Sequence, residues 1–255
     1  MNAPKCQPED YIDFLVASPR AVSGTEAART QPGGRMVAHD ACTRLLHRLE
    51  PDAAALWGEA APLVARGRGV LVLDDSVLDK PYAKRMDLVA RQWSGKHTRV
   101  VRGSGLATLL WTDGAALIPR DDRLYDKEAD GLTKNDHARA LLDTAQERGF
   151  APELVLFDSW HASLPDLKAV RAHGWHWTTQ LKGNRAVNPD GTGNRRLDAC
   201  EIAEGGTRVH RQGYGFIVVF RLGVAVAFFL ADQGVDAGGD AGGRADAHVE
   251  DRVAG

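Results

Sequence analysis

The sequence predicts an α/β fold, a mixed sheet with flanking helices, and three features predict it. Two apolar runs, residues 70–73 and 154–157, lack polar alternation, which is typical of strands buried on both faces. Between them, Asp113-Gly114 joins two more strand-like runs, and Asp-Gly favours a two-residue hairpin because both positions tolerate positive φ. Helix signals alternate with the later strands, which favours a sheet covered by helices.

Both apolar runs end in a carboxylate followed by a serine. Asp74-Asp75-Ser76 follows the first run, and Asp158-Ser159 follows the second. An aspartate just past a buried strand lies at the carboxyl edge of the sheet, where open α/β sheets place their ligands. If the two strands are neighbours, the carboxylates repel one another unless a divalent cation lies between them. The pair therefore predicts a metal site, although either aspartate alone is equally compatible with a turn.

The N-terminal region, residues 1–67, is predicted to be helical. Apolar residues recur at helical spacing in residues 11–16, 37–49 and 55–64. These helices are expected to pack together, and contact with DNA is the alternative role.

The predicted body, residues 68–187, continues with a helix, a strand, a second helix and a third strand. Thr133 with Asp136 forms a capping-box pattern, and Ser163 begins the second helix. The third strand is expected at residues 175–181. Beyond the body, residues 188–230 are expected to form a partial β-rich region with strands at 207–210 and 215–222. Residues 231–255, rich in Gly, Ala and Asp, are predicted to be disordered.

The composition is that of an ordinary soluble protein. Of 255 residues, 44% are hydrophobic and 26% are charged. The longest apolar segment, residues 216–231, is too short to cross a bilayer and contains Arg221. Residues 1–10 lack the apolar core of a signal peptide, and three scattered cysteines give neither a disulfide framework nor zinc-ligand spacing. We expect a cytoplasmic protein.

Basic residues cluster in one stretch. Residues 80–102 contain seven Lys or Arg side chains and a single acidic residue, Asp87. Such a stretch suits contact with phosphates, since cations that displace counterions provide the sequence-independent part of nucleic-acid affinity. A solvated basic loop is the alternative interpretation. The predicted DNA-binding residues are Lys80, Lys84, Arg85, Lys96, Arg99, Arg102, Lys182 and Arg185.

At this point the chain resembles a known family. A hairpin-extended strand bearing one Asp, then a helix, then a strand bearing a second Asp, is the arrangement of the ribonuclease H-like fold. Residues 73–81 and 155–160 resemble the first two acidic motifs of DDE transposases of bacterial insertion sequences, in the group whose catalytic core carries a β-rich insertion. Residues 131–135 and 213–216 resemble the same core. The resemblance covers roughly residues 10–222.

The resemblance implies a function and a site. It implies metal-dependent cleavage and transfer of DNA strands at insertion-sequence ends, with two Mg²⁺ or Mn²⁺ ions. Asp74 and Asp158 would be the first and second catalytic, metal-binding carboxylates. Asp75 is the alternative first ligand, because aligning the two serines pairs it with Asp158; the family pattern favours Asp74. The implied partner is double-stranded DNA, at the element's ends and at the target, with a homodimer as the candidate assembly. His97, His137 and His161 are interpreted as surface or structural residues.

The chain departs from the family at its third carboxylate. The family has a glutamate on a helix after the β-rich insertion, and no such helix is predicted here. Glu201 and Glu204 lie within the insertion, and Glu250 lies in the Gly/Ala/Asp-rich tail. The family-like sequence stops near Leu222, as a shifted reading frame in GC-rich DNA would produce. The hypothesis is a frameshifted or truncated transposase that is inactive alone.

Other interpretations compete with this one. The chain could be a non-catalytic DNA-binding remnant or a regulator of transposition, or a gene remnant that folds poorly. A phosphatase of the haloacid dehalogenase class is disfavoured, because it needs a second Asp two positions after the first, where Ser76 stands.

Overall fold

The computed structural model describes residues 4–18, 23–32, 37–50, 52–222 and 226–230. It divides into two compact units, Met1–Ala55 and Leu56–Gly255, which we describe separately. In the described ranges, no helix has both the length and the apolar character that a membrane crossing requires.

The first unit is helical. Its helices enclose a core that includes Phe14, Leu45 and two cysteines, Cys6 and Cys42, whose Sγ atoms lie 3.8 Å apart. The structure adds a short helix that the apolar spacing did not predict. The helices are α1 (Pro8–Ala17), α2 (Gly24–Arg29) and α3 (His39–Arg48). The helix predicted near residues 55–64 is α4 (Ala53–Ala60), followed by the 3₁₀ helix η2 (Ala61–Leu63).

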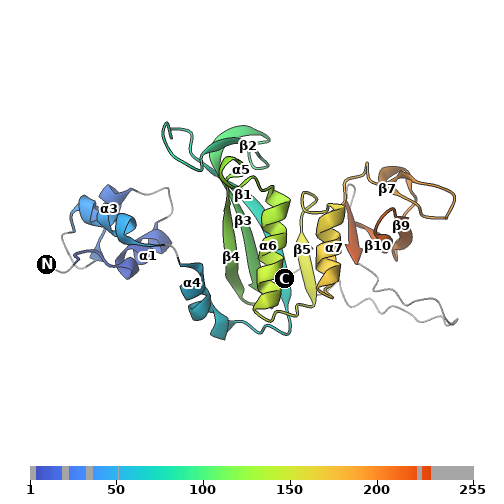
Figure 1. The fold of residues 1–255 in the computed structure, drawn as a ribbon, viewed down its shortest axis with the longest axis horizontal. Helices are drawn as coiled ribbons and strands as arrows, with labels where there is room; N and C mark the ends of the chain where they lie inside the picture. The colour runs from blue at the N-terminus through green and yellow to red at the C-terminus, as the bar shows by residue number, and fades with distance from the viewer. Residues whose placement is uncertain (1–3, 19–22, 33–36, 51, 223–225, 231–255) are drawn as a thin grey trace. The chain divides into compact units, whose positions relative to one another are not determined.

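The second unit is built on a six-stranded mixed sheet, which confirms the predicted α/β fold (Figure 1). Strands β1, β5 and β6 are parallel neighbours, and β3 pairs antiparallel with β1. On its other side β3 pairs with β2 and then with β4. The strands are β1 (Val70–Asp79), β2 (Ala90–Ser94), β3 (Arg99–Thr112), β4 (Leu117–Tyr125), β5 (Leu154–Phe157) and β6 (Trp177–Thr179).

The strands depart from the prediction in three ways. Strand β1 does not end at Asp74 but continues to Asp79, because it stays paired with β3 as far as Gly103. Strand β2 was not predicted. The turn at Asp113-Gly114 is not a two-residue turn: Thr112 pairs with Leu117, and the Asp113 carboxylate accepts backbone N–H bonds from residues 115 and 116. The Asp113 side chain thus satisfies backbone N–H groups that do not pair across the strands, and the loop between β3 and β4 is wider than a two-residue turn.

The two faces of the sheet differ in burial. Leu71, Leu73, Val155 and Phe157 are buried in one cluster with the apolar residues of the helices α6 (Lys134–Glu147) and α7 (Leu164–Ala172). Figure 1 shows α6 and α7 on the same side of the sheet. We call this side the helix face. The alternate residues of β1 and β5 point the other way and are half-buried at 70, 72, 154 and 156. We call that side the distal face.

The predicted helix caps are confirmed. The hydroxyl of Thr133 accepts a hydrogen bond from the backbone N–H of Asp136, and the Asp136 carboxylate accepts one from the backbone N–H of Thr133. At α7, Ser163 caps the helix by accepting from the backbone N–H of Asp166. Both helices therefore begin at the positions that the sequence indicates. A short helix, α5 (Lys127–Asp130), precedes α6.

A β-rich region follows β6. It is tied to the main sheet by a hydrogen bond of 2.7 Å from the indole N–H of Trp177 to the hydroxyl of Tyr214. Its elements are β7 (Ala186–Val187), β8 (Arg195–Arg196), the 3₁₀ helix η3 (Leu197–Ala199), β9 (Thr207–Arg211), β10 (Gly215–Leu222) and β11 (Val226–Leu230). The predicted disorder of residues 231–255 lies outside the described residues.

Candidate active site

Asp74 and Asp158 lie at the same level on neighbouring parallel strands. In the β1–β5 register, Leu73 is opposite Phe157, and one further step along both chains reaches the two aspartates. Because side chains alternate along a strand, both carboxylates belong to the distal face. Asp158 lies just past β5, and its Oδ1 accepts a hydrogen bond of 2.8 Å from the backbone N–H of Trp160. The local turn thus fixes one oxygen of this carboxylate.

The pKa of Asp74 is raised above its usual value. Although Asp74 is an exposed residue, desolvation of its carboxylate by neighbouring groups is the largest cause, and it is opposed by a hydrogen bond from the backbone N–H of Asp75. The negative charges of Asp75 and Asp158 raise the pKa further, and His161 lowers it. The carboxylates therefore repel one another in the metal-free protein, and a cation between Asp74 and Asp158 would relieve this repulsion.

Asp75 has different surroundings. It belongs to the helix face, where its carboxylate forms an ion pair with Lys134, the first residue of α6. The Nε2 atom of His161, a side chain that is 1% exposed, lies 3.8 Å from its Oδ1. The carboxylate of Asp75 thus has protein side chains as partners, whereas no ion pair to Asp74 is found within the described residues.

The donor set at Asp74 and Asp158 suits a hard divalent cation. Carboxylate oxygens are the ligands that Mg²⁺ and Mn²⁺ prefer, and Mg²⁺ commonly binds to one or two carboxylates while keeping several waters. In the described parts of the chain, no group of three or more His, Cys, Asp or Glu side chains converges on one point. The site fits a metal held by two protein carboxylates and water.

The predicted DNA-binding residues fall into two groups. Lys80, Lys84 and Arg85 follow β1, while Lys96, Arg99 and Arg102 belong to the β2–β3 hairpin; all six are exposed. Lys182 and Arg185 follow β6, beside the strand that delivers Asp158. The Nζ of Lys182 lies 4.8 Å from the ring centroid of Trp160, so a cation and an exposed indole lie next to the carboxylate turn.

Sequence reasoning missed two side chains near the carboxylates. Lys134 opens a helix whose cap was recognised, but its contact with Asp75 joins residues 59 positions apart. His161 was interpreted as structural, and its burial agrees with that, but its position beside Asp75 depends on the β1–β5 pairing. The capping box, which starts α6 at the edge where β1 carries its aspartates, was the available clue to Lys134.

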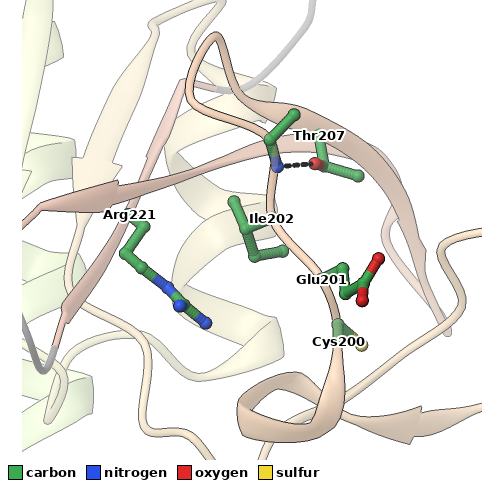
Figure 2. Close-up of a pocket in the computed structure, with 6 residues that line it drawn as sticks. Cys200, Glu201, Ile202, Thr207 and Arg221 are labelled. Atoms are coloured by element: carbon green, nitrogen blue, oxygen red, sulfur yellow. Dashed lines mark hydrogen bonds between the residues drawn. The ribbon is translucent and has the colours of Figure 1, made fainter.

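A separate pocket of about 530 Å³ lies in the β-rich region (Figure 2). Thr207 accepts a hydrogen bond of 2.9 Å from the backbone N–H of Ala203 at its rim. Neither candidate carboxylate lines it, so it is distinct from the predicted site. Its lining residues are Cys200, Glu201, Ile202, Ala203, Thr207 and Arg221.

Comparison with known proteins gives a family and a fold. A family model described as DDE superfamily endonuclease matches residues 15–198. Among solved structures, the chain is similar to the piggyBac transposase in a synaptic complex with hairpin DNA, at 10% identity and a TM-score of 0.51 over 94% of this chain and 55% of that one. This chain therefore spans about half the length of the piggyBac chain. No curated protein matches.

Two further structures are similar at lower scores. The Drosophila P element transposase in a strand transfer complex has 9% identity and a TM-score of 0.34, over 73% of this chain and 50% of that one. Endonuclease V from Bacillus subtilis has 13% identity and a TM-score of 0.31, over 76% of each chain. At these identities the piggyBac comparison supports the fold alone, and the two lower scores carry no further argument.

Proposed function

This chain belongs to the DDE superfamily endonucleases, and from that premise we propose that it is a transposase that cleaves and transfers DNA strands with divalent metal ions. The observation that carries the proposal is the β1–β5 register, which brings Asp74 and Asp158 to one level of the sheet. Because the two carboxylates lie side by side, metal ions bound to them would contact the same phosphate. In-line displacement at phosphorus uses metal ions placed in this way.

The proposed roles follow from the surroundings of each residue. Asp74 and Asp158 bind the metal ions, which when bound would activate the attacking oxygen and stabilise the leaving one. The β1–β3 ladder holds Asp74 in place, and the backbone N–H of Trp160 orients Asp158. Asp75 pairs with Lys134 on the other face of β1 and is assigned no role in metal binding.

The proposed partner is double-stranded DNA, at insertion-sequence ends and at a target. The exposed cations after β1 and in the β2–β3 hairpin, together with the exposed Lys182 after β6, support it, because cations bind the phosphates of DNA. A homodimer is part of the proposal, because the resemblance to transposases implies action on paired DNA ends.

We further propose that this chain alone is weakly active or inactive. Two carboxylates hold a divalent ion less firmly than three. No helix with a glutamate follows the β-rich region within the described residues, which end at residue 230. The second candidate function, a non-catalytic DNA-binding regulator of transposition, is favoured by the same two-carboxylate site.

A nicking assay tests the proposal. Purified protein is incubated with supercoiled plasmid and Mn²⁺, and Asp74→Asn and Asp158→Asn are compared with Asp75→Asn as the matched control. We expect slow, metal-dependent nicking that each of the first two substitutions reduces by roughly 100-fold or more, while Asp75→Asn retains most of it. Salt-dependent DNA binding without any nicking would favour the regulator; nicking lost only in Asp75→Asn would move the first ligand to Asp75.

A further inference from the structure

The β2–β3 hairpin exposes an unusual set of side chains. Trp93 pairs directly with Val100, and Arg91 pairs directly with Arg102. Directly opposed residues of an antiparallel pair point to the same face, and so do residues two positions apart. Trp93 is 50% exposed, Val100 is 55% exposed, and both arginines are exposed. These four residues form one surface, which we call the hairpin patch.

The hairpin patch lies on the same face of the sheet as the candidate carboxylates. Strand β3 is paired without a shift along β2 and β1, and its residue Thr108 is opposite Asp74. Val100 and Arg102 are even numbers of residues from Thr108, so they share its face. At the usual rise of a strand, Val100 and Thr108 are at most about 27 Å apart. That distance is the length of about eight base pairs of duplex DNA.

The two arginines of the patch do not stabilise the hairpin. Like charges directly opposite one another destabilise a sheet, and neither Arg91 nor Arg102 forms an ion pair within the described part of the chain. An indole and a valine beside them are left in contact with water. Paired guanidinium groups next to an exposed aromatic ring match a nucleic-acid backbone, where cations bind phosphates and aromatic rings pack on sugars or unpaired bases.

On the opposite side of the hairpin, side chains are held by contacts within the protein. Gln92 donates a hydrogen bond of 2.7 Å to the carbonyl of Gly103, and His97 forms an ion pair with Asp79. Ser94, which pairs with Arg99, is 3% exposed. The hairpin is therefore fixed through its helix face and leaves its distal face free for a partner. Arg99 lies on the helix face and is exposed, so it is a matched control for the arginines of the patch.

We propose that the hairpin patch binds the duplex DNA that leads away from the cut site, within about eight base pairs of the phosphate at Asp74 and Asp158. The proposal rests on the proposed function, because the distance is counted from those carboxylates. The proposal separates the arginines of residues 91–102 by the face of the sheet on which they lie: Arg91 and Arg102 contact this DNA, and Arg99 does not.

Binding of the full chain to a fluorescent 30-base-pair duplex, measured by anisotropy at several salt concentrations without metal, tests the assignment. The double variant Arg91→Ala/Arg102→Ala is compared with Lys96→Ala/Arg99→Ala, which removes the same charge from the same hairpin. We expect the patch variant to bind about tenfold more weakly and to lose about two from the slope of log affinity against log salt. The control should change either value by less than half as much. Equal effects of the two variants would overturn the proposal.

Two further measurements separate this proposal from its alternatives. Hydroxyl-radical footprinting of duplex DNA bound to the Asp74→Asn variant should show protected nucleotides. Adding Arg91→Ala/Arg102→Ala to this variant should remove that protection. If wild-type protein never nicks DNA, but its protection of DNA is lost in Arg91→Ala/Arg102→Ala, the patch binds DNA and the regulator of transposition is favoured over the transposase. If Trp93→Ala instead turns a dimer into a monomer in sedimentation, with DNA affinity unchanged, the patch joins two copies of the chain and the proposal is wrong.

Discussion

Asp74 and Asp75 are neighbours with opposite electrostatic surroundings. Asp74 lies on the distal face with Asp158, and its pKa is raised chiefly by burial. Asp75 lies on the helix face against Lys134 and the buried His161. The charge of Asp74 therefore has no ion-pair partner among the described residues, whereas that of Asp75 is paired with Lys134. A carboxylate whose charge costs folding free energy, placed beside a second carboxylate on a neighbouring strand, is typical of a functional site.

This contrast predicts opposite effects on stability in EDTA. Because the folded state raises the pKa of Asp74, it holds that proton more firmly than the unfolded chain does, so stability falls as pH rises from 3.8 through the folded pKa. Asp74→Asn should remove this loss and raise the melting temperature at neutral pH. Asp75→Asn should lower stability by about 1–3 kcal/mol, since Lys134 and His161 lose a charged partner. Thermal unfolding across acidic and neutral pH checks both signs, and a lower melting temperature in both variants would contradict the argument.

At the scale of elements, β4 contains an irregularity that buries an arginine. Leu109 is opposite Asp121 while Leu110 is opposite Pro119, so Arg120 is the extra residue of a bulge. Its guanidinium lies 4.1 Å from the ring centroid of Trp57 in α4 and 4.6 Å from that of Phe150. No hydrogen-bond partner of its nitrogens is found among the described residues. Burial, with the nearby Arg148 charge, lowers the pKa of Arg120 to about 10.

The two partners in this stack should respond differently to substitution. Trp57→Ala removes half of the stack around a buried charge and should cost about 2–4 kcal/mol of unfolding free energy. Arg120→Met keeps most of the volume and removes an unpaired charge, so its cost should stay below about 1 kcal/mol. Urea unfolding of both variants measures the difference. If Arg120→Met costs as much as Trp57→Ala, the cation–π contacts outweigh the desolvation of the guanidinium.

The sequence predicted those elements whose causes are local. The caps at Thr133 and Ser163 and the apolar runs that become β1 and β5 depend on residues close in the chain. Strand β2 and the outer half of β1 could not be predicted, because they form through pairing with β3 and lack a strong alternation of their own. For the same reason the equal level of Asp74 and Asp158 was an expectation, and the contact of Lys134 with Asp75 was not foreseen.

At the scale of the whole molecule, the candidate site and the hairpin patch both lie in the second unit. The first unit, Met1–Ala55, has a core of its own. Ligands that act through Asp74 and Asp158 should therefore stabilise the second unit selectively. A two-carboxylate site is expected to bind divalent ions weakly, with a dissociation constant on the order of 1 mM.

Metal binding then has a localised and measurable effect. At a Mn²⁺ concentration about ten times that dissociation constant, the stabilisation is about 1.4 kcal/mol. Hydrogen exchange should show slower exchange in β1 and at the end of β5, and unchanged exchange in α1 and α3. Asp74→Asn/Asp158→Asn is the control and should abolish the protection, because it removes the charged ligands while keeping side-chain volume. Protection that persists in this variant, or that appears equally in the first unit, would place the metal elsewhere and remove the basis for the two-carboxylate site.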